Sequence, residues 1–216
     1  MSAPGSGPRS APVARISRSA LSANAREARA RGIHSFSSRI FEADAWGHGA
    51  ELVRTVLAAE GLTHGRDEDG TLAAAELFGV GHARAVPALR LTGTVLSVKD
   101  LRSGEGVSYG FAFRAPADTR IALVTGGYAQ GIVRALGGAV DVAIAGERHP
   151  IVGRVAMDVC VVEVRDAVVR RGDETLFLGD PALGEPSLAD WVGATGLVAA
   201  ELITMVGLRS IREEAP

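Results

Sequence analysis

The segment FEADAWGHGA, residues 41–50, gathers several side chains that can take part in chemistry. Glu42 supplies a carboxylate, Trp46 an indole and His48 an imidazole, and two glycines permit tight backbone turns. A lone Gly-His-Gly turn is more often a plain connection between elements than a site. By themselves, these residues therefore name no reaction.

Two tyrosines and a carboxylate are further candidates. Tyr109 in GVSYGF has the chemistry of a general acid or base, although a tyrosine in a predicted strand is more often a half-buried packing residue. Tyr128 in GGYAQG lies in a glycine-rich loop, where an exposed aromatic ring favours a site. Asp158 follows Met157 in an apolar run, and we expect an arginine or backbone amides to satisfy its carboxylate.

Several reaction classes lack a motif. The histidines have no metal-ligand spacing, so we expect no metal site, and neither a Walker-type phosphate loop nor a Gly-X-Ser-X-Gly elbow occurs. The lone cysteine, Cys160, lies in VAMDVCVVEV, which predicts a buried structural thiol. The lone lysine, Lys99, is the only side chain able to form an imine with an aldehyde cofactor.

Length and charge narrow the class of protein. The 216 residues suffice for one large or two small domains, and a hydrophobic content of 47% can fill a core. The net charge of -2 comes from interspersed charges, which favour neither a nucleic acid nor a membrane partner. No apolar run approaches the ~18 residues of a membrane span, and the amino terminus lacks the apolar core of a secretory signal. We therefore expect a cytoplasmic protein.

The elements that must position these residues fall into two halves. Residues 1–12 are rich in Ser, Pro and Gly and predict a disordered tail. Residues 13–84 alternate strand and helix, as in an α/β unit. The expected elements are a strand in VARIS, a helix in SRSALSANAREARARGI capped by Ser17 or Ser19 and ended by Gly32, a strand at 37–44, a helix at 48–60 and a charged loop at 63–71, while LAAAELFGVG fits a helix or a strand.

Residues 85–216 predict a β-domain. Segments rich in strand formers are separated by Gly, Pro, Asp and Ser turns, at a spacing that suggests a compact barrel or sandwich. They are LRLTGTVLSVKDL, EGVSYGFAFRA, TRIALVTGG, AVDVAIAG, PIVGRVAMDVCVVEV and DETLFLG, followed by expected helices in SLADWVGATG and AAELITMVG.

Taken together, these motifs resemble the fold-type III, pyridoxal-phosphate-dependent alanine racemase family. ARISRSALSANAREARARG is similar to the family's opening strand and helix, and EADAWGHGAELV to its Lys-Ala-Asp-Ala-Tyr-Gly-His-Gly segment. Five later segments are similar, in order, to the family's carboxy-terminal β-domain: GEGVSYG, GGYAQGIVRAL, IAGERHPIVGRVAMDVCVVEV, GDETLFLG and AAELITMVGLRSIRE.

The resemblance implies roles for single residues. Tyr109 matches the tyrosine that reaches across a dimer interface and exchanges a proton with the substrate α-carbon, whereas Tyr128 and Met157 match residues that shape substrate binding. Glu42 stands where the working enzymes have the lysine that holds pyridoxal phosphate, and Trp46 where they have a phosphate-contacting tyrosine.

That departure marks the turn, His48 included, as a degenerate cofactor site. A carboxylate cannot form a Schiff base, and it repels a phosphate. The family also places a (β/α)8 barrel of ~250 residues between these motifs, whereas Glu42 and Tyr109 are only 67 positions apart. Most of that barrel therefore has no counterpart, with the join near residues 62–86.

The resulting expectation is a mainly β fold, namely a racemase-like carboxy-terminal β-barrel with the first strand–helix unit of an otherwise missing (β/α)8 barrel. This isolated strand–helix unit must pack on its own β-domain, pack on a second copy or stay partly ordered. Because members of the family form dimers, the resemblance favours a homodimer. We expect no pyridoxal phosphate and no racemase activity, but a binding or dimerisation module whose partner is a second copy or a full-length racemase. The alternatives are a pyridoxal-phosphate-dependent alanine racemase or isomerase with residual activity, or one completed by a partner chain, and a fragment without selected activity.

Overall fold

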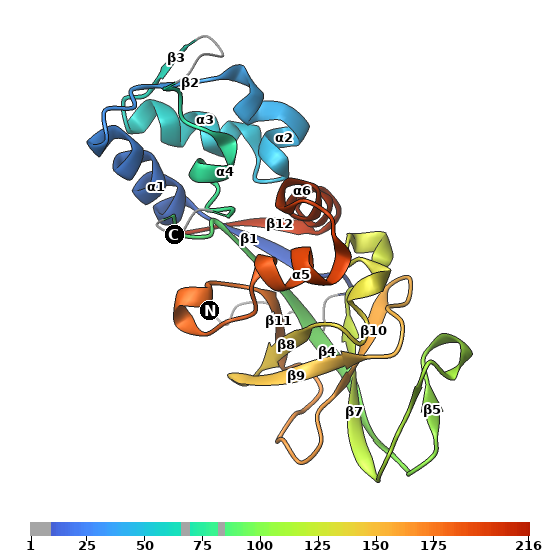
Figure 1. Ribbon diagram of the computed structural model, residues 1–216. Coiled ribbons are helices and arrows are strands. Elements are labelled where there is room, and N and C mark those ends of the chain that lie inside the picture. The colour runs from blue at the N-terminus through green and yellow to red at the C-terminus, as the bar shows by residue number, and fades with distance from the viewer. Residues whose placement is uncertain (1–9, 66–69, 82–84) are drawn as a thin grey trace.

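A closed β-barrel of six strands forms the centre of the computed structural model, which describes residues 10–65, 70–81 and 85–216 (Figure 1). The ring order is β4, β7, β10, β9, β8 and β11, and the pairing of β11 with β4 closes it. This confirms a mainly β fold and decides between the expected barrel and sandwich. The strands are β4 (Leu89–Leu101), β7 (Thr119–Thr125), β8 (Asp141–Ile144), β9 (Glu147–Val152), β10 (Val159–Glu163) and β11 (Glu174–Leu178).

The long strand β4 pairs with different barrel strands along its length. Its first half pairs with β11, and its second half pairs with β7 after a register shift between Val95 and Ser97. A Cβ at Gly93 would lie 2.5 Å from the carbonyl oxygen of Thr125, so only glycine allows this close approach of β4 and β7. The barrel can close because this one strand bends from one neighbour to the other.

Two further strands extend the sheet beyond the barrel. Strand β1 (Val13–Ser17) lies between β4 and β12 (Ile211–Ala215), antiparallel to the first and parallel to the second. The strand expected in VARIS is confirmed, and β12 is an element that the sequence patterns did not reveal. Because Val13 and Ile16 are buried, β1 adds its apolar residues to the core of this sheet.

The helical unit lies at one end of the barrel, with α6 and β12 between them (Figure 1). The expected helices are confirmed: the side chain of Ser17 caps the first by accepting a hydrogen bond from the Ala20 amide at 3.1 Å. LAAAELFGVG forms a short helix rather than a strand. The elements are α1 (Arg18–Ala30), α3 (Ala50–Ala59), α4 (Ala74–Leu77) and two parallel strands of two residues, β2 (Ser35–Phe36) and β3 (Thr63–His64).

Residues 37–44 do not form the expected strand. A 3-10 turn, η1 (Ser38–Phe41), leads into α2 (Glu42–Trp46), where Ala43, Asp44 and Ala45 have φ of 50 to 56° and so wind left-handed. Left-handed winding of non-glycine residues costs roughly 1–2 kcal/mol per residue. Propensity rules therefore cannot anticipate this turn, and tertiary contacts must hold it.

The helical unit docks on its own chain, which is the first of the expected alternatives. Turn α2 packs on α6 (Ala199–Arg209), and a Cβ at Gly47 would lie 2.6 Å from the Cα of Gly207. Helix α5 (Leu188–Thr195), which is capped by Ser187, packs beside α6 and contributes the buried Trp191. The expected loop at 63–71 and tail at 1–12 lie partly outside the described residues, and the boundary between 84 and 85 stays a prediction.

Of the described helices, none is long and apolar enough to cross a bilayer alone. Only α5 and α6, bent by 112° at their junction, meet that test of length and composition as a pair.

Candidate functional site

The left-handed turn presents Glu42 to solvent. Its backbone leaves the preceding 3-10 turn at φ -56° and ψ 144°, and the carboxylate is exposed. The neighbouring Trp46 turns inward instead, with its ring centroid 5.5 Å from that of Phe78. The turn therefore offers one free carboxylate and an indole already engaged in packing.

Asp44 and Arg212 tie this turn to β12. Arg212 Nη1 donates to Asp44 Oδ2 at 2.6 Å and to the Gly47 carbonyl oxygen at 3.2 Å. The other carboxylate oxygen of Asp44 accepts from the Ala50 amide at 2.8 Å and so caps α3. The Ala50 bond is the main reason that the pKa of Asp44 lies below its ordinary value, and the Arg212 guanidinium adds to it.

His48 is fully buried beneath the turn. Its ring stacks on Phe78 at 4.1 Å and 10°, and Nδ1 lies 2.9 Å from the Ala45 carbonyl oxygen. Nδ1 must carry the proton for that contact to be a hydrogen bond, and Nε2 has no partner among the described residues. Burial lowers the pKa of His48 to about 4, so the ring is neutral and structural near pH 7.

Tyr109 lies on a strained turn and not in a strand. The turn η2 (Tyr109–Phe111) joins β5 (Gly106–Val107) to β6 (Phe113–Arg114), and both Ser108 and Phe111 have positive φ. The tyrosine is 58% exposed, so the expectation of a half-buried packing residue was wrong. Positive φ at non-glycine residues persists only when surrounding contacts enforce it, and it is concentrated at functional sites.

Tyr128 and Met157 sit on adjoining loops. The Tyr128 amide donates to the Ala156 carbonyl oxygen at 2.9 Å, and the Ala129 amide to that of Met157 at 3.0 Å. A Cβ at Gly127 would lie 2.2 Å from the Met157 carbonyl oxygen, so this approach requires glycine. Both side chains are exposed, as the glycine-rich loop predicted for Tyr128.

One loop links these two turns. The Arg154 amide donates to Ser108 Oγ at 2.7 Å beside Tyr109, and Met157 follows three positions later beside Tyr128. Four exposed apolar side chains lie on these two turns and on this loop, and we call them the exposed aromatic face: Tyr109, Phe111, Tyr128 and Met157. The Arg134 guanidinium carbon, 5.8 Å from the Tyr109 ring centroid, adds positive charge at this face.

The structure does not bring the turn and the face together within one chain. Turn α2 and strand β5 lie at opposite ends of the molecule (Figure 1). Lys99 is exposed on β4, eight positions from Leu91, which shares a row of the sheet with Ala14 and Arg212. At a rise of ~3.3 Å per strand residue, Lys99 lies roughly 25 Å along β4 from that row. Arg212, which holds the turn, is two strands away from Leu91 in the same row.

Two further predictions had different outcomes. Asp158 is exposed and precedes β10, and its partner is the Gln130 side chain at 3.0 Å rather than an arginine. Cys160 is buried, as predicted, and burial raises its pKa to about 12, which keeps the thiol unreactive.

Sequence reasoning missed three contributors to these sites. Arg212 and Asp44 lie 168 positions apart, so no local pattern could pair them. Phe111 is overlooked because a phenylalanine in GFAFRA fits a buried strand face. Its only local signal is Gly110, which permits the turn that exposes it.

The chain is similar to known proteins, most clearly over its β-domain. The profile of the family described as "Alanine racemase, C-terminal domain" matches residues 88–214. An alanine racemase of Mycobacterium leprae is 42% identical over 134 residues, which are 61% of this chain and 34% of that protein. An alanine racemase of Thermobifida fusca is 38% identical over 123 residues, 57% of this chain and 33% of that protein. The chain thus spans about a third of the length of these curated relatives.

Solved structures show the same fold. The alanine racemase of Streptomyces coelicolor superposes with a TM-score of 0.79 at 19% identity, covering 95% of this chain and 98% of that chain. That of Enterococcus faecalis ("E.faecalis") superposes with a TM-score of 0.80 at 17% identity, covering 94% and 97%.

Proposed function

The chain belongs to the alanine racemase family through its C-terminal domain, and from that premise we propose that it is a non-catalytic relative that binds another subunit. The proposal places it in the cytoplasm, which suits a lone buried cysteine. It acts there as a binding or dimerisation module.

The glutamate at position 42 carries the proposal. Pyridoxal phosphate, the cofactor implied by the family, needs an amine for its imine and cationic or neutral donors for its phosphate. This turn instead presents an exposed carboxylate, and Lys99, the only lysine, is on a distant part of β4. The residues present therefore do not fit this cofactor, and we derive no reaction step through it.

The exposed aromatic face supports the binding role. Tyr109 and Phe111 are 58% and 61% exposed on a turn with several positive-φ residues, and Met157 is 51% exposed on the loop that carries Arg154. Exposed apolar side chains that gather on one face mark interaction surfaces, and tyrosine is enriched at the centre of such interfaces. We propose that this face forms a homodimer or receives a full-length alanine racemase.

Absorbance and sedimentation together test the proposal. Protein mixed with pyridoxal phosphate should show no borohydride-reducible adduct on Lys99 and no racemisation of alanine, while sedimentation should show a dimer at micromolar concentration. Tyr109→Ala should weaken that dimer about tenfold or more, because truncating an interface anchor costs at least ~1–2 kcal/mol. Leu183→Ala, which truncates a 74% exposed apolar residue away from the face, is the control. A Lys99 adduct with turnover, or a monomer at all concentrations with no racemase bound, would overturn the proposal.

A second candidate function rests on the exposed hydroxyl of Tyr109. If the chain pairs with a full-length racemase, this tyrosine can supply the partner's proton-transfer group, as its family counterpart does. Mixing the chain with a full-length racemase whose matching tyrosine is replaced by phenylalanine should then restore racemisation. Tyr109→Phe in this chain should abolish the rescue without weakening the complex, and absence of rescue in a stable complex excludes this function.

A further inference from the structure

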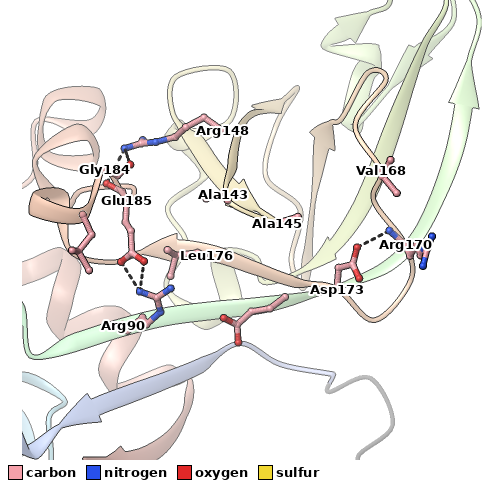
Figure 2. A pocket seen from close by; sticks show the side chains of 13 residues that line it. Arg90, Ala143, Ala145, Arg148, Val168, Arg170, Asp173, Leu176, Gly184 and Glu185 are labelled. Carbon is pink, nitrogen blue, oxygen red and sulfur yellow. Dashed lines mark hydrogen bonds and ion pairs between the residues drawn. The ribbon is translucent and has the colours of Figure 1, made fainter.

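A cleft of about 680 Å³ opens on the barrel wall away from the exposed aromatic face, and we call it the outer cleft. Its floor is formed by β8, β11 and the first half of β4. In Figure 2, Arg90, Arg148 and Glu185 gather at one end, Val168 and Arg170 lie at the other, and small apolar side chains lie between them. Its volume is within the usual range of small-ligand sites.

At the first end, the guanidinium group of Arg90 is paired with the carboxylate of Glu185. Arg90 Nη1 lies 2.6 and 2.5 Å from the two carboxylate oxygens of Glu185, one of which also accepts from the Asp180 amide at 2.8 Å. Burial alone would raise the pKa of Glu185, but the Arg90 and Asp180 hydrogen bonds outweigh it and hold the pKa below its ordinary value. Glu185 is therefore charged and its acceptor capacity is largely used.

Arg148 has no carboxylate of its own inside the cleft. Its Nη2 donates to the carbonyl oxygens of Gly184 and Glu185 at 3.1 and 2.8 Å, which are uncharged acceptors. Asp190, outside the cleft, lies 3.8 Å from Nη1, and both side chains are substantially exposed, so this ion pair is weak. Among the residues that line this end of the cleft, two guanidinium groups therefore stand against one carboxylate, and the carboxylate of Asp190 lies outside the lining.

The opposite end has no such excess. Asp173 Oδ2 accepts from the Arg170 backbone amide at 2.7 Å, and these two residues bring one carboxylate and one guanidinium to this end. Glu174 is paired with Arg15 at 2.6 Å. An anionic ligand at this end would lie near the carboxylates of Asp173 and Glu174. The Arg90 and Arg148 end is therefore the favoured anion site.

The middle of the cleft is apolar. Ala143 and Leu176 form the floor between the two ends (Figure 2), and Leu183 and Val168 at the margins are each 74% exposed. Covering two aliphatic side chains this exposed with an apolar part of a ligand would be favourable. An occupant should therefore combine an anion with an aliphatic part.

We propose that the outer cleft binds a carboxylate carried on a short aliphatic body, with the carboxylate between Arg90 and Arg148 and the body along Ala143 and Leu176. A guanidinium pair matches a carboxylate in both charge and donor geometry. The source is a free short-chain carboxylic acid or an acidic side chain of a peptide. This site does not depend on the proposed function, because it lies outside both the turn and the exposed aromatic face.

Two-dimensional amide NMR titrations test the site with hexanoate as the free acid and N-acetyl-Leu-Glu-amide as the peptide. Hexanol, which lacks the charge, and acetate, which lacks the body, are the ligand controls. We expect saturable shifts around Ala143, Leu176 and Leu183 with a Kd of about 1 mM for the better probe, the range open to a ligand of this size. Both ligand controls should bind at least about fivefold more weakly.

Four variants locate the binding. Arg148→Gln should weaken the better probe about tenfold, Asp190→Asn should tighten it by removing a competing carboxylate, and Ala143→Leu should abolish it by filling the floor. Arg170→Gln, an arginine at the other end, should change the Kd less than about twofold. Saturation by either probe with this variant pattern supports the site and identifies its source. Saturation by neither probe, or equal weakening by Arg148→Gln and Arg170→Gln, overturns the proposal. Arg148→Gln also removes the hydrogen bonds to the loop carbonyl oxygens of Gly184 and Glu185. Ala143→Leu and Asp190→Asn keep those bonds, so they test the site even if Arg148→Gln alters the loop.

Discussion

Burial fixes the charge of His48 and makes stability depend on pH. The folded protein holds its pKa at about 4 against an ordinary value of 6.5, mainly because the buried ring loses solvation. Between these two pH values the His48 imidazole binds a proton in the unfolded chain but not in the folded chain. The free energy of unfolding should therefore fall as the pH drops from 6.5 towards 4, by up to about 3 kcal/mol, and should not change through this group above that window.

Urea denaturation at pH 7 and at pH 4.5 measures this difference. His48→Gln should remove most of it, whereas His34→Gln, at an exposed position, should leave it in place. A smaller dependence should persist in the first variant, because burial also lowers the pKa of His149. An unchanged pH dependence in His48→Gln would show that other groups cause it.

At the scale of elements, the left-handed turn depends on Asp44. This carboxylate caps α3 through the Ala50 amide and binds Arg212, so its loss leaves that amide without its acceptor and Arg212 without its carboxylate. Asp44→Ala should lower the free energy of unfolding by about 1–2 kcal/mol, as removal of a helix cap does. Glu51→Ala, which removes only an exposed pair with Arg54, should cost less than about 0.5 kcal/mol in the same urea titration. Equal effects of the two variants would contradict the capping role.

Docking of α2 on α6 depends on two facing glycines. A Cβ at Gly207 would lie 2.8 Å from the Cα of Gly47, backbone that cannot swing aside. Gly207→Ala should therefore cost about 1–3 kcal/mol in thermal or urea unfolding through overpacking. Gly193→Ala in α5 meets nothing within 4 Å and should stabilise by up to about 1 kcal/mol through helix propensity. A stabilised Gly207→Ala variant would show that the two elements are not in close contact.

These elements also show where sequence reasoning succeeds. Helix α1 follows from local signals, the Ser17 cap and the positive φ of Gly32, and the barrel strands follow from runs of strand formers between turns. The left-handed turn and the Tyr109 turn do not, because each relies on contacts from residues far along the chain, Arg212 for the first and Arg154 for the second. Local propensity predicts elements that are stable through local interactions, and both candidate sites lie where tertiary contacts override it.

For the whole molecule, the separation of position 42 from Tyr109 limits what one substitution can restore. Glu42→Lys supplies an amine, yet turn α2 and strand β5 remain at opposite ends of the molecule (Figure 1). Only 67 positions separate residues 42 and 109, where the family has most of a (β/α)8 barrel. An imine on this lysine would be exposed to water and distant from Tyr109 of its own chain. We therefore expect Glu42→Lys to form at most a borohydride-reducible adduct with pyridoxal phosphate.

The measurement for that variant is the formation of D-alanine from L-alanine in the presence of excess pyridoxal phosphate. The expected rate is that of the same mixture without protein, both for Glu42→Lys and for the double variant Glu42→Lys/Tyr109→Phe. A rate above this background that disappears in the double variant would mean that Tyr109 of a second copy reaches the new lysine. Homodimerisation would then complete an active site across two chains, and the distance between position 42 and Tyr109 within one chain would not limit the activity of this variant.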